Sequence, residues 1–286
     1  LLACGARDRS SNLRPDVFGD TTRRAKRGPV SPLELTHGDL NRTTDRHGQT
    51  ETYARSSSAV TTSDAPVPDG SARVAALRAG LALYAAGEHH AAHDPWETVW
   101  LGLRNAVATG VAAERAVRDE ALFHGLIQFT AAQHHARDRN WSGAVGLAKS
   151  GREYLAELPD DYRGVNVAAA RDALVQLRAD PERVEREPAP ALTDDGERVA
   201  AESLSLAAAG LAAEALAEEH GLDADAVADA ARFAREEEAV GRSRFAALVF
   251  DFVRADDAGS RGIVYDRLTG LVAQERRKEE DVAGLF

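Results

Sequence analysis

The stretch that decides the fold covers residues 113–138 and reads AERAVRDEALFHGLIQFTAAQHHARD. Its large apolar side chains, from Leu122 to Phe129, fall on one broad arc when successive residues are placed 100° apart, as in an α-helix. His134 falls inside that arc and is expected to project toward a core. The stretch therefore predicts a long helix with one apolar face. The polar residues on the opposite side, which we expect to be exposed, are His124, Gln128 and His135.

Helical periodicity extends outward from this stretch over most of the chain, with no alternating strand pattern. The fold class predicted is therefore all-α, as two small helical bundles or arrays over residues 71–180 and 194–286. Residues 181–193, rich in Pro and Glu, are expected to form the linker between them. Further helices are expected at about 71–86, 88–104, 141–157, 166–179, 194–219, 223–240, 243–255 and 261–279. For the helix at 88–104 an alternative stays open, in which Asp94-Pro95-x-Glu97 is an internal cap and residues 88–93 form a preceding turn or a kinked first segment.

The composition changes near residue 70. Residues 1–70 hold 10 basic and 9 acidic residues, whereas residues 71–286 hold 25 and 37. The first stretch has no sustained apolar period, and Met is absent from the whole chain, position 1 included. We therefore expect residues 1–70 to be a disordered or spurious N-terminal extension that precedes the helical body.

The net charge of −11 and the single Cys exclude several classes of protein. One Cys cannot build a disulfide framework or a thiolate zinc site. No apolar run approaches the ~20 residues that span a membrane, and the acidic balance disfavours a general nucleic-acid binder. We expect a soluble, cytoplasmic protein. The acidic, Lys-poor body is typical of a salt-accumulating archaeal halophile, although GC-rich codon usage would give a similar composition.

Chemistry is concentrated in the segment Gly87-Glu88-His89-His90-Ala91-Ala92-His93-Asp94-Pro95-Trp96-Glu97-Thr98-Val99-Trp100. If His93 and Glu97 lie on one helix, their i, i+4 spacing puts an imidazole and a carboxylate on one face, where they can chelate a divalent metal ion. His134 is the expected third ligand. Three interpretations stay open: a structural polar cluster between helices, a ligand or metal site, and a catalytic acid–base pair.

Two spaced motifs resemble a known family. They are His93-Asp94-x-x-Glu97-x-x-Trp100, and Leu122-x-x-Gly125-Leu126-Ile127-Gln128 followed by Ala131-Ala132-x-His134. Together they resemble domain of unknown function family 309, over about residues 72–180. The resemblance implies a small all-α domain whose biochemical role is not established. The candidate ligand-binding or polar cluster that results is His93, Asp94, Glu97, Trp100, Gln128 and His134.

Common catalytic signatures are absent from the sequence, among them the phosphate-binding loop, the H-E-x-x-H zinc motif and the G-x-S-x-G elbow. We therefore expect a non-enzymatic module that binds a small ligand or a protein partner. The alternative is a metal-dependent, hydrolase-like enzyme that uses His93, Glu97 and His134, with Asp94 as an orienting group or base. The apolar C-terminal tail, with Val282, Leu285 and Phe286, either folds back onto its own domain or docks into a partner's groove.

Overall fold

The computed structural model describes residues 42–44, 50–52, 67–110, 112–238 and 243–283. Two short strands, β1 (Arg42–Thr44) and β2 (Thr50–Thr52), pair in antiparallel register. The remaining elements are helical, which confirms the predicted all-α class. They are α1 (Gly70–Ala85), α2 (His93–Ala108), α3 (Glu114–Arg137), α4 (Trp141–Leu155), α5 (Val167–Ala179), η1 (Pro181–Glu185), η2 (Ala201–Ser203), α6 (Leu206–Glu219), α7 (Ala224–Glu238), α8 (Arg244–Arg254) and α9 (Ala258–Ala283).

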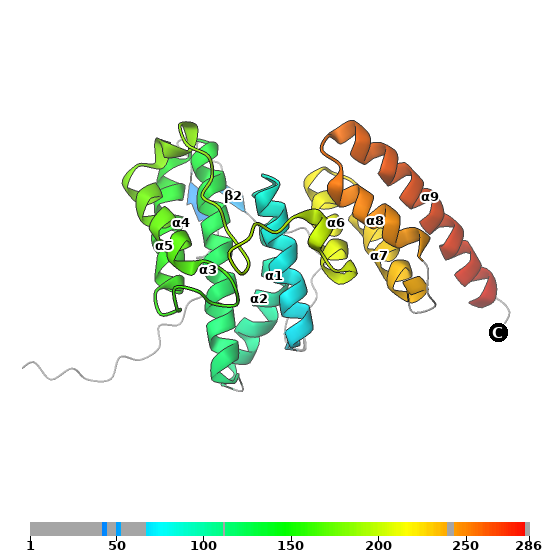
Figure 1. Ribbon diagram of the computed structural model, residues 1–286, viewed down its shortest axis with the longest axis horizontal. Helices are drawn as coiled ribbons and strands as arrows, with labels where there is room; N and C mark the ends of the chain where they lie inside the picture. Colours follow the sequence, from blue (N-terminus) through cyan, green and yellow to red (C-terminus); the bar gives the residue numbers. More distant parts are fainter. Residues whose placement is uncertain (1–41, 45–49, 53–66, 111, 239–242, 284–286) are drawn as a thin grey trace, which may run out of the picture.

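The helices form two sets, visible in Figure 1 as a cyan-to-green group and a yellow-to-red group. In the first set α3 packs against α2 and α4, and α5 packs against α4. In the second set each of α6 to α9 packs against its neighbour in sequence. Helix α1 joins the sets because it contacts both α2 and α6. One continuous apolar core runs through both sets as a result.

Local capping explains several of the helix boundaries. The Asp69 side chain accepts a hydrogen bond from the Ala72 amide, which starts α1 at Gly70. The Asn140 side chain accepts from the Gly143 amide at 3.1 Å and starts α4 at Trp141. Helix α2 differs from the prediction, because it begins at His93 and residues 88–92 form the turn before it. The expected start near residue 88 is therefore wrong and the alternative of a turn before the helix is right, although Ala92 rather than Asp94 stands at the cap.

The second set also departs from the expected helix boundaries. Helix α6 begins at Leu206, twelve residues after the start expected at about 194. Residues before it form short bridges instead: Val165 pairs with Asp194, and Asp194 pairs with Glu197. Ser205 then caps α6 by accepting a hydrogen bond from the Ala208 amide.

The segment 181–193 is held against the first helical set. The Tyr84 hydroxyl donates a hydrogen bond to the Pro190 carbonyl at 2.7 Å, and the Asn166 side chain donates to the Ala191 carbonyl at 3.0 Å. Leu192 is buried. The division into domains at this segment stays a prediction, as does the assignment of residues 1–70. Most of residues 1–70 lie outside the described residues.

Candidate functional site

The site is built on the turn that connects α1 to α2. Gly87 ends α1 with a φ of +90°, a left-handed conformation that favours glycine. Its amide donates to the Tyr84 carbonyl, and the Glu88 amide donates to the Leu83 carbonyl. This reversal brings His89 and His90 next to the first turn of α2. The turn therefore gathers several imidazoles at one end of the first helical set.

Helix α2 places three potential metal ligands together at its start. One ligand atom from each of His93, Asp94 and Glu97 lies within 4.8 Å of the others. Nδ1 of His93 is shielded from solvent and makes no hydrogen bond, although Oδ1 of Asp94 is only 2.9 Å away. A shielded ring nitrogen without a hydrogen bond is costly unless something else contacts it. In the tautomer that leaves Nδ1 unprotonated, its lone pair can bind a cation.

His90 and His134 surround this group. The ring of His90 lies 4.9 Å from that of His93 and 5.2 Å from that of His134, measured between centroids. Nε2 of His134 lies 3.2 Å from a carboxylate oxygen of Asp138. Burial lowers the pKa of His134, and the neighbouring His90 and His93 act in the same direction while Asp138 opposes them. The prediction that His134 points into the apolar core is wrong, because its side chain is 30% exposed beside the other imidazoles.

A carboxylate from the second helical set completes the cluster. The Nδ1–H of His90 donates to Oε2 of Glu219, at the end of α6, over 2.5 Å. This hydrogen bond raises the pKa of His90 and lowers the pKa of Glu219. The cluster therefore bridges α2, α3 and α6, which come from both helical sets.

The structure brings four of the six candidate residues into this region and leaves two elsewhere. Trp100 lies further along α2, where its indole N–H donates to Glu120 at 2.7 Å. Its ring is 4.5 Å from that of His124, which in turn stacks on Tyr154 at 3.6 Å. Gln128 lies against Gly151 of α4. Both side chains therefore belong to the packing of α3 rather than to the imidazole cluster.

The exposed face that we expected on α3 is absent. The residues placed on that face, His124, Gln128 and His135, are each at most 9% exposed. Helix α4 packs along this side, and its Gly151 allows α3 to approach closely. Helix α3 is therefore buried on two sides, and the imidazole of His124 is an aromatic packing element.

Sequence reasoning missed Glu219 in this cluster and Asp119 near the start of α3. Glu219 has no local signal that connects it to His90, since 129 positions separate them. Asp119 is also missed: it is 1% exposed and takes hydrogen bonds from Arg73, Arg163 and Tyr162. Its position next to Glu120 in an otherwise amphipathic helix resembles an ordinary charged face.

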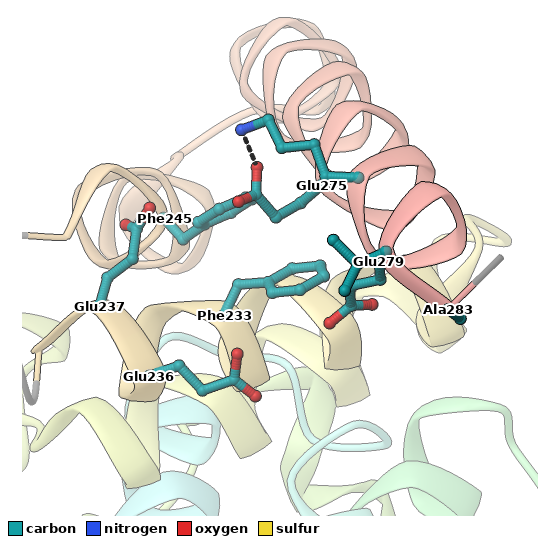
Figure 2. Close-up of a pocket in the computed structure, with 9 residues that line it drawn as sticks. Phe233, Glu236, Glu237, Phe245, Glu275, Glu279 and Ala283 are labelled. Carbon is teal, nitrogen blue, oxygen red and sulfur yellow. Dashed lines mark hydrogen bonds and ion pairs between the residues drawn. The ribbon is translucent and has the colours of Figure 1, made fainter. Parts of the chain in front are cut away.

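A groove in the second helical set is lined by one residue of the apolar C-terminal tail, for which folding back and docking to a partner were both open. Figure 2 shows Phe233 and Phe245 at its floor, with glutamates around them. Val282 lines the groove and is 56% exposed, whereas Leu285 and Phe286 lie outside the described residues. The glutamates are largely neutralised: Arg232 contacts Glu279, Arg244 contacts Glu237, and Lys278 contacts Glu275.

Comparison with known families agrees with the two sequence motifs. Residues 77–147 match the model of a family described as Domain of unknown function (DUF309), which confirms the predicted resemblance over this segment. The match runs from within α1 to within α4 and includes the cluster residues of α2 and α3. No match was found among curated proteins. Among the described helices, none is long and apolar enough to cross a membrane.

Proposed function

We propose that this chain is a helical binding module whose ligand is a divalent first-row transition-metal ion held at the start of α2. The observation that carries the proposal is the grouping of His93, Asp94 and Glu97 within 4.8 Å. Imidazole and carboxylate donors together suit Zn²⁺, Mn²⁺ and related ions. The group holds two of the three ligands expected from the sequence and has Asp94 in place of His134.

The electrostatics of the site favour a cation despite its position. The first turn of a helix carries a partial positive charge, which repels a metal ion. Two carboxylates, Asp94 and Glu97, outweigh that partial charge. His90 is already occupied by Glu219 and helps to fix the turn. Imidazoles that do not bind the ion can still orient its ligands, as outer groups do in many metal sites.

Replacing Glu97 by Gln tests the proposal, because the amide keeps the shape of the side chain and removes its charge. We expect the full chain to bind about one equivalent of Zn²⁺ or Mn²⁺, and Glu97→Gln to weaken binding by at least about tenfold. Glu114→Gln, at a side chain that is 87% exposed on α3, is the matched control and should bind as the parent does. Isothermal titration and elemental analysis of dialysed protein give affinity and stoichiometry. Equal binding by all three proteins, or none, would contradict the proposal.

A second candidate function is a metal-dependent hydrolase. It is favoured by the partial exposure of the group: the side chains of His93 and Asp94 are 18% and 16% exposed, so water and a small substrate can reach them. A bound ion would lower the pKa of a coordinated water. Metal-stimulated hydrolysis of a p-nitrophenyl ester or phosphate that disappears in Glu97→Gln would favour the enzyme over the binding module.

The proposed setting is the cytoplasm of a halophile. The support is the acidic composition of residues 71–286, with 37 acidic against 25 basic residues. Repulsion among these charges is screened within about 3 Å at 1 M salt but reaches about 30 Å at 0.01 M. We therefore expect the far-UV circular dichroism of the helices to decrease on dialysis from molar KCl to low salt. An unchanged spectrum would argue against this setting.

A further inference from the structure

A cavity of about 320 Å³ is lined in part by Gly87 and His89, from the turn that connects α1 to α2. It is formed by the end of α1, the turn after it, the end of α3 and the segment that leads to the second helical set. Its size falls within the range of pockets that hold small organic ligands. The residues that line it are Tyr84, Ala85, Gly87, His89, Arg137, Pro188, Ala189, Pro190, Ala191, Leu192 and Arg198.

The charged side chains that line this cavity are positive, whereas the net charge of the chain is negative. Its lining contains two arginines, Arg137 and Arg198, and no carboxylate, although the chain has 46 acidic residues. Arg198 makes no hydrogen bond or ion pair with the described residues, and the guanidinium of Arg137 contacts a neutral imidazole rather than an acid. Two guanidinium groups without carboxylate partners form a positively charged wall. Arginine binds carboxylates and phosphates through paired N–H donors.

His89 fixes the position of Arg137. Its ring is 6% exposed and lies 4.6 Å from that of Tyr84. Burial lowers the pKa of His89 to about 4, and the charge of Arg137 acts in the same direction, so the imidazole is neutral near pH 7. Nδ1 of His89 can then accept a hydrogen bond from Arg137 over 2.5 Å. The guanidinium is thereby held at the cavity while its other N–H groups stay available.

The remaining walls of the cavity are apolar and held in place. Pro188, Pro190 and Leu192 supply them, and the buried Tyr84 hydroxyl ties Pro190 down through its carbonyl. Arg137 also lines a smaller hollow of about 70 Å³, which shares the proline wall with the cavity. Gln133 lines that hollow together with Glu187 and makes no hydrogen bond with the described residues. The amide N–H groups of Gln133 are further donors for a ligand oxygen.

We infer that this cavity binds a small organic anion, in which a carboxylate or phosphate group contacts Arg137 and Arg198 and an apolar body lies on the proline wall. The site is distinct from the proposed metal site, since none of His93, Asp94 and Glu97 lines it. Binding here uses charge and apolar contact together, so an anion with an aromatic body should bind more tightly than a bare anion.

Titration calorimetry of the full chain with three probes at constant ionic strength tests the inference. The probes are phenyl phosphate, benzoate and inorganic phosphate. We expect at least one aromatic anion to bind with a dissociation constant below about 10 mM and more tightly than inorganic phosphate. Comparison of phenyl phosphate with benzoate identifies the preferred anionic group. Failure of both aromatic anions to bind, or binding no tighter than that of inorganic phosphate, would overturn the inference.

Three substitutions locate the binding. Arg198→Gln and Arg137→Gln should each lower the binding affinity for the aromatic anion by at least about tenfold, which is the effect of one lost charge-assisted contact. Arg152→Gln removes the same charge from an exposed position on α4 outside the cavity and should leave binding unchanged. Arg198 has no partner to lose, so Arg198→Gln preserves the fold and keeps the test decisive. Equal binding by Arg198→Gln and Arg152→Gln would overturn the assignment.

Discussion

Replacing Asp119 by Ala is expected to lower the free energy of unfolding by about 3–5 kcal/mol, the usual cost of breaking a buried ion pair from one side. The Asp119 carboxylate is 1% exposed. It accepts from Arg73 at 2.7 Å, from Tyr162 at 2.8 Å and from Nε of Arg163 at 2.8 Å. Removing it leaves two partly buried guanidinium groups without their counter-ion. The variant therefore loses the connection between α1, α3 and the turn at residues 162–163.

Urea denaturation followed by circular dichroism measures this loss. Asp172→Ala is the matched control, because Asp172 is exposed on α5 and should change stability by no more than about 0.5 kcal/mol. The loss of stability in Asp119→Asn should lie between those of Asp119→Ala and Asp172→Ala, since the amide can still accept hydrogen bonds but carries no charge. A change for Asp119→Ala as small as that of the control would show that the arginines find other partners.

The same carboxylate makes stability depend on acid pH. Burial alone would raise the pKa of Asp119, but hydrogen bonds from Arg163, Arg73 and Tyr162 outweigh it and the pKa is lowered from 3.8. A lowered pKa in the folded state means that this stabilisation is complete above the unfolded value and is lost as the pH falls through the folded value. The stability difference between the parent and Asp119→Ala should therefore shrink below about pH 4.

The sequence predicted the parts of the candidate site that depend on local spacing along one helix. His93 and Glu97 lie four residues apart, and the helix that brings them together begins where the motif does. The long helix α3 was predicted for the same reason. The cluster itself could not be predicted in full, because His90 meets Glu219 only after α6 has packed beside α1. Asp119 meets Arg73 across 46 residues, a distance at which spacing carries no information.

The error at His124 has a different physical cause. A helical wheel shows which side chains share a face, but it does not show how many faces are covered. A helix face made of alanines and glycines has a low average hydrophobicity and resembles an exposed face. Such a face can still be buried, because small residues let a second helix approach closely. Gly125 lies so near Leu155 that an added Cβ would be 2.4 Å from its side chain. A helical wheel therefore predicts an exposed polar side of α3, although α4 covers that side.

Substituting Gly80 by Ala is the second large effect we expect, and it acts through the same kind of close approach. A Cβ at Gly80 would lie 2.3 Å from two atoms of the Trp96 indole and 2.7 Å from the Ala92 carbonyl oxygen. Trp96 is fully buried, and its indole N–H donates to the Leu77 carbonyl at 3.2 Å. The ring has no free space to enter, so we expect a loss of about 2–3 kcal/mol even after the gain in helix propensity.

Gly146→Ala is the matched control, and we expect it to change the free energy of unfolding in the opposite direction. Gly146 is an exposed position of α4 with nothing within 4 Å of an added Cβ, so the substitution should stabilise by about 0.5–1 kcal/mol through helix propensity alone. Denaturation midpoints measured under one set of conditions compare the two variants directly. Stabilisation by Gly80→Ala would mean that α1 and α2 do not approach as closely as the structure shows.

Gly80→Ala also tests where the metal ion binds, because the clash falls on the helix turn that carries the proposed ligands. Trp96 and Ala92 flank His93 and Asp94 in sequence, so a displaced indole shifts the first turn of α2. In protein that is still folded, we expect Gly80→Ala to weaken Zn²⁺ binding and Gly146→Ala to leave it unchanged. Ligand positions in a metal site tolerate only small displacements. Unaltered Zn²⁺ affinity in folded Gly80→Ala would place the ion away from the start of α2.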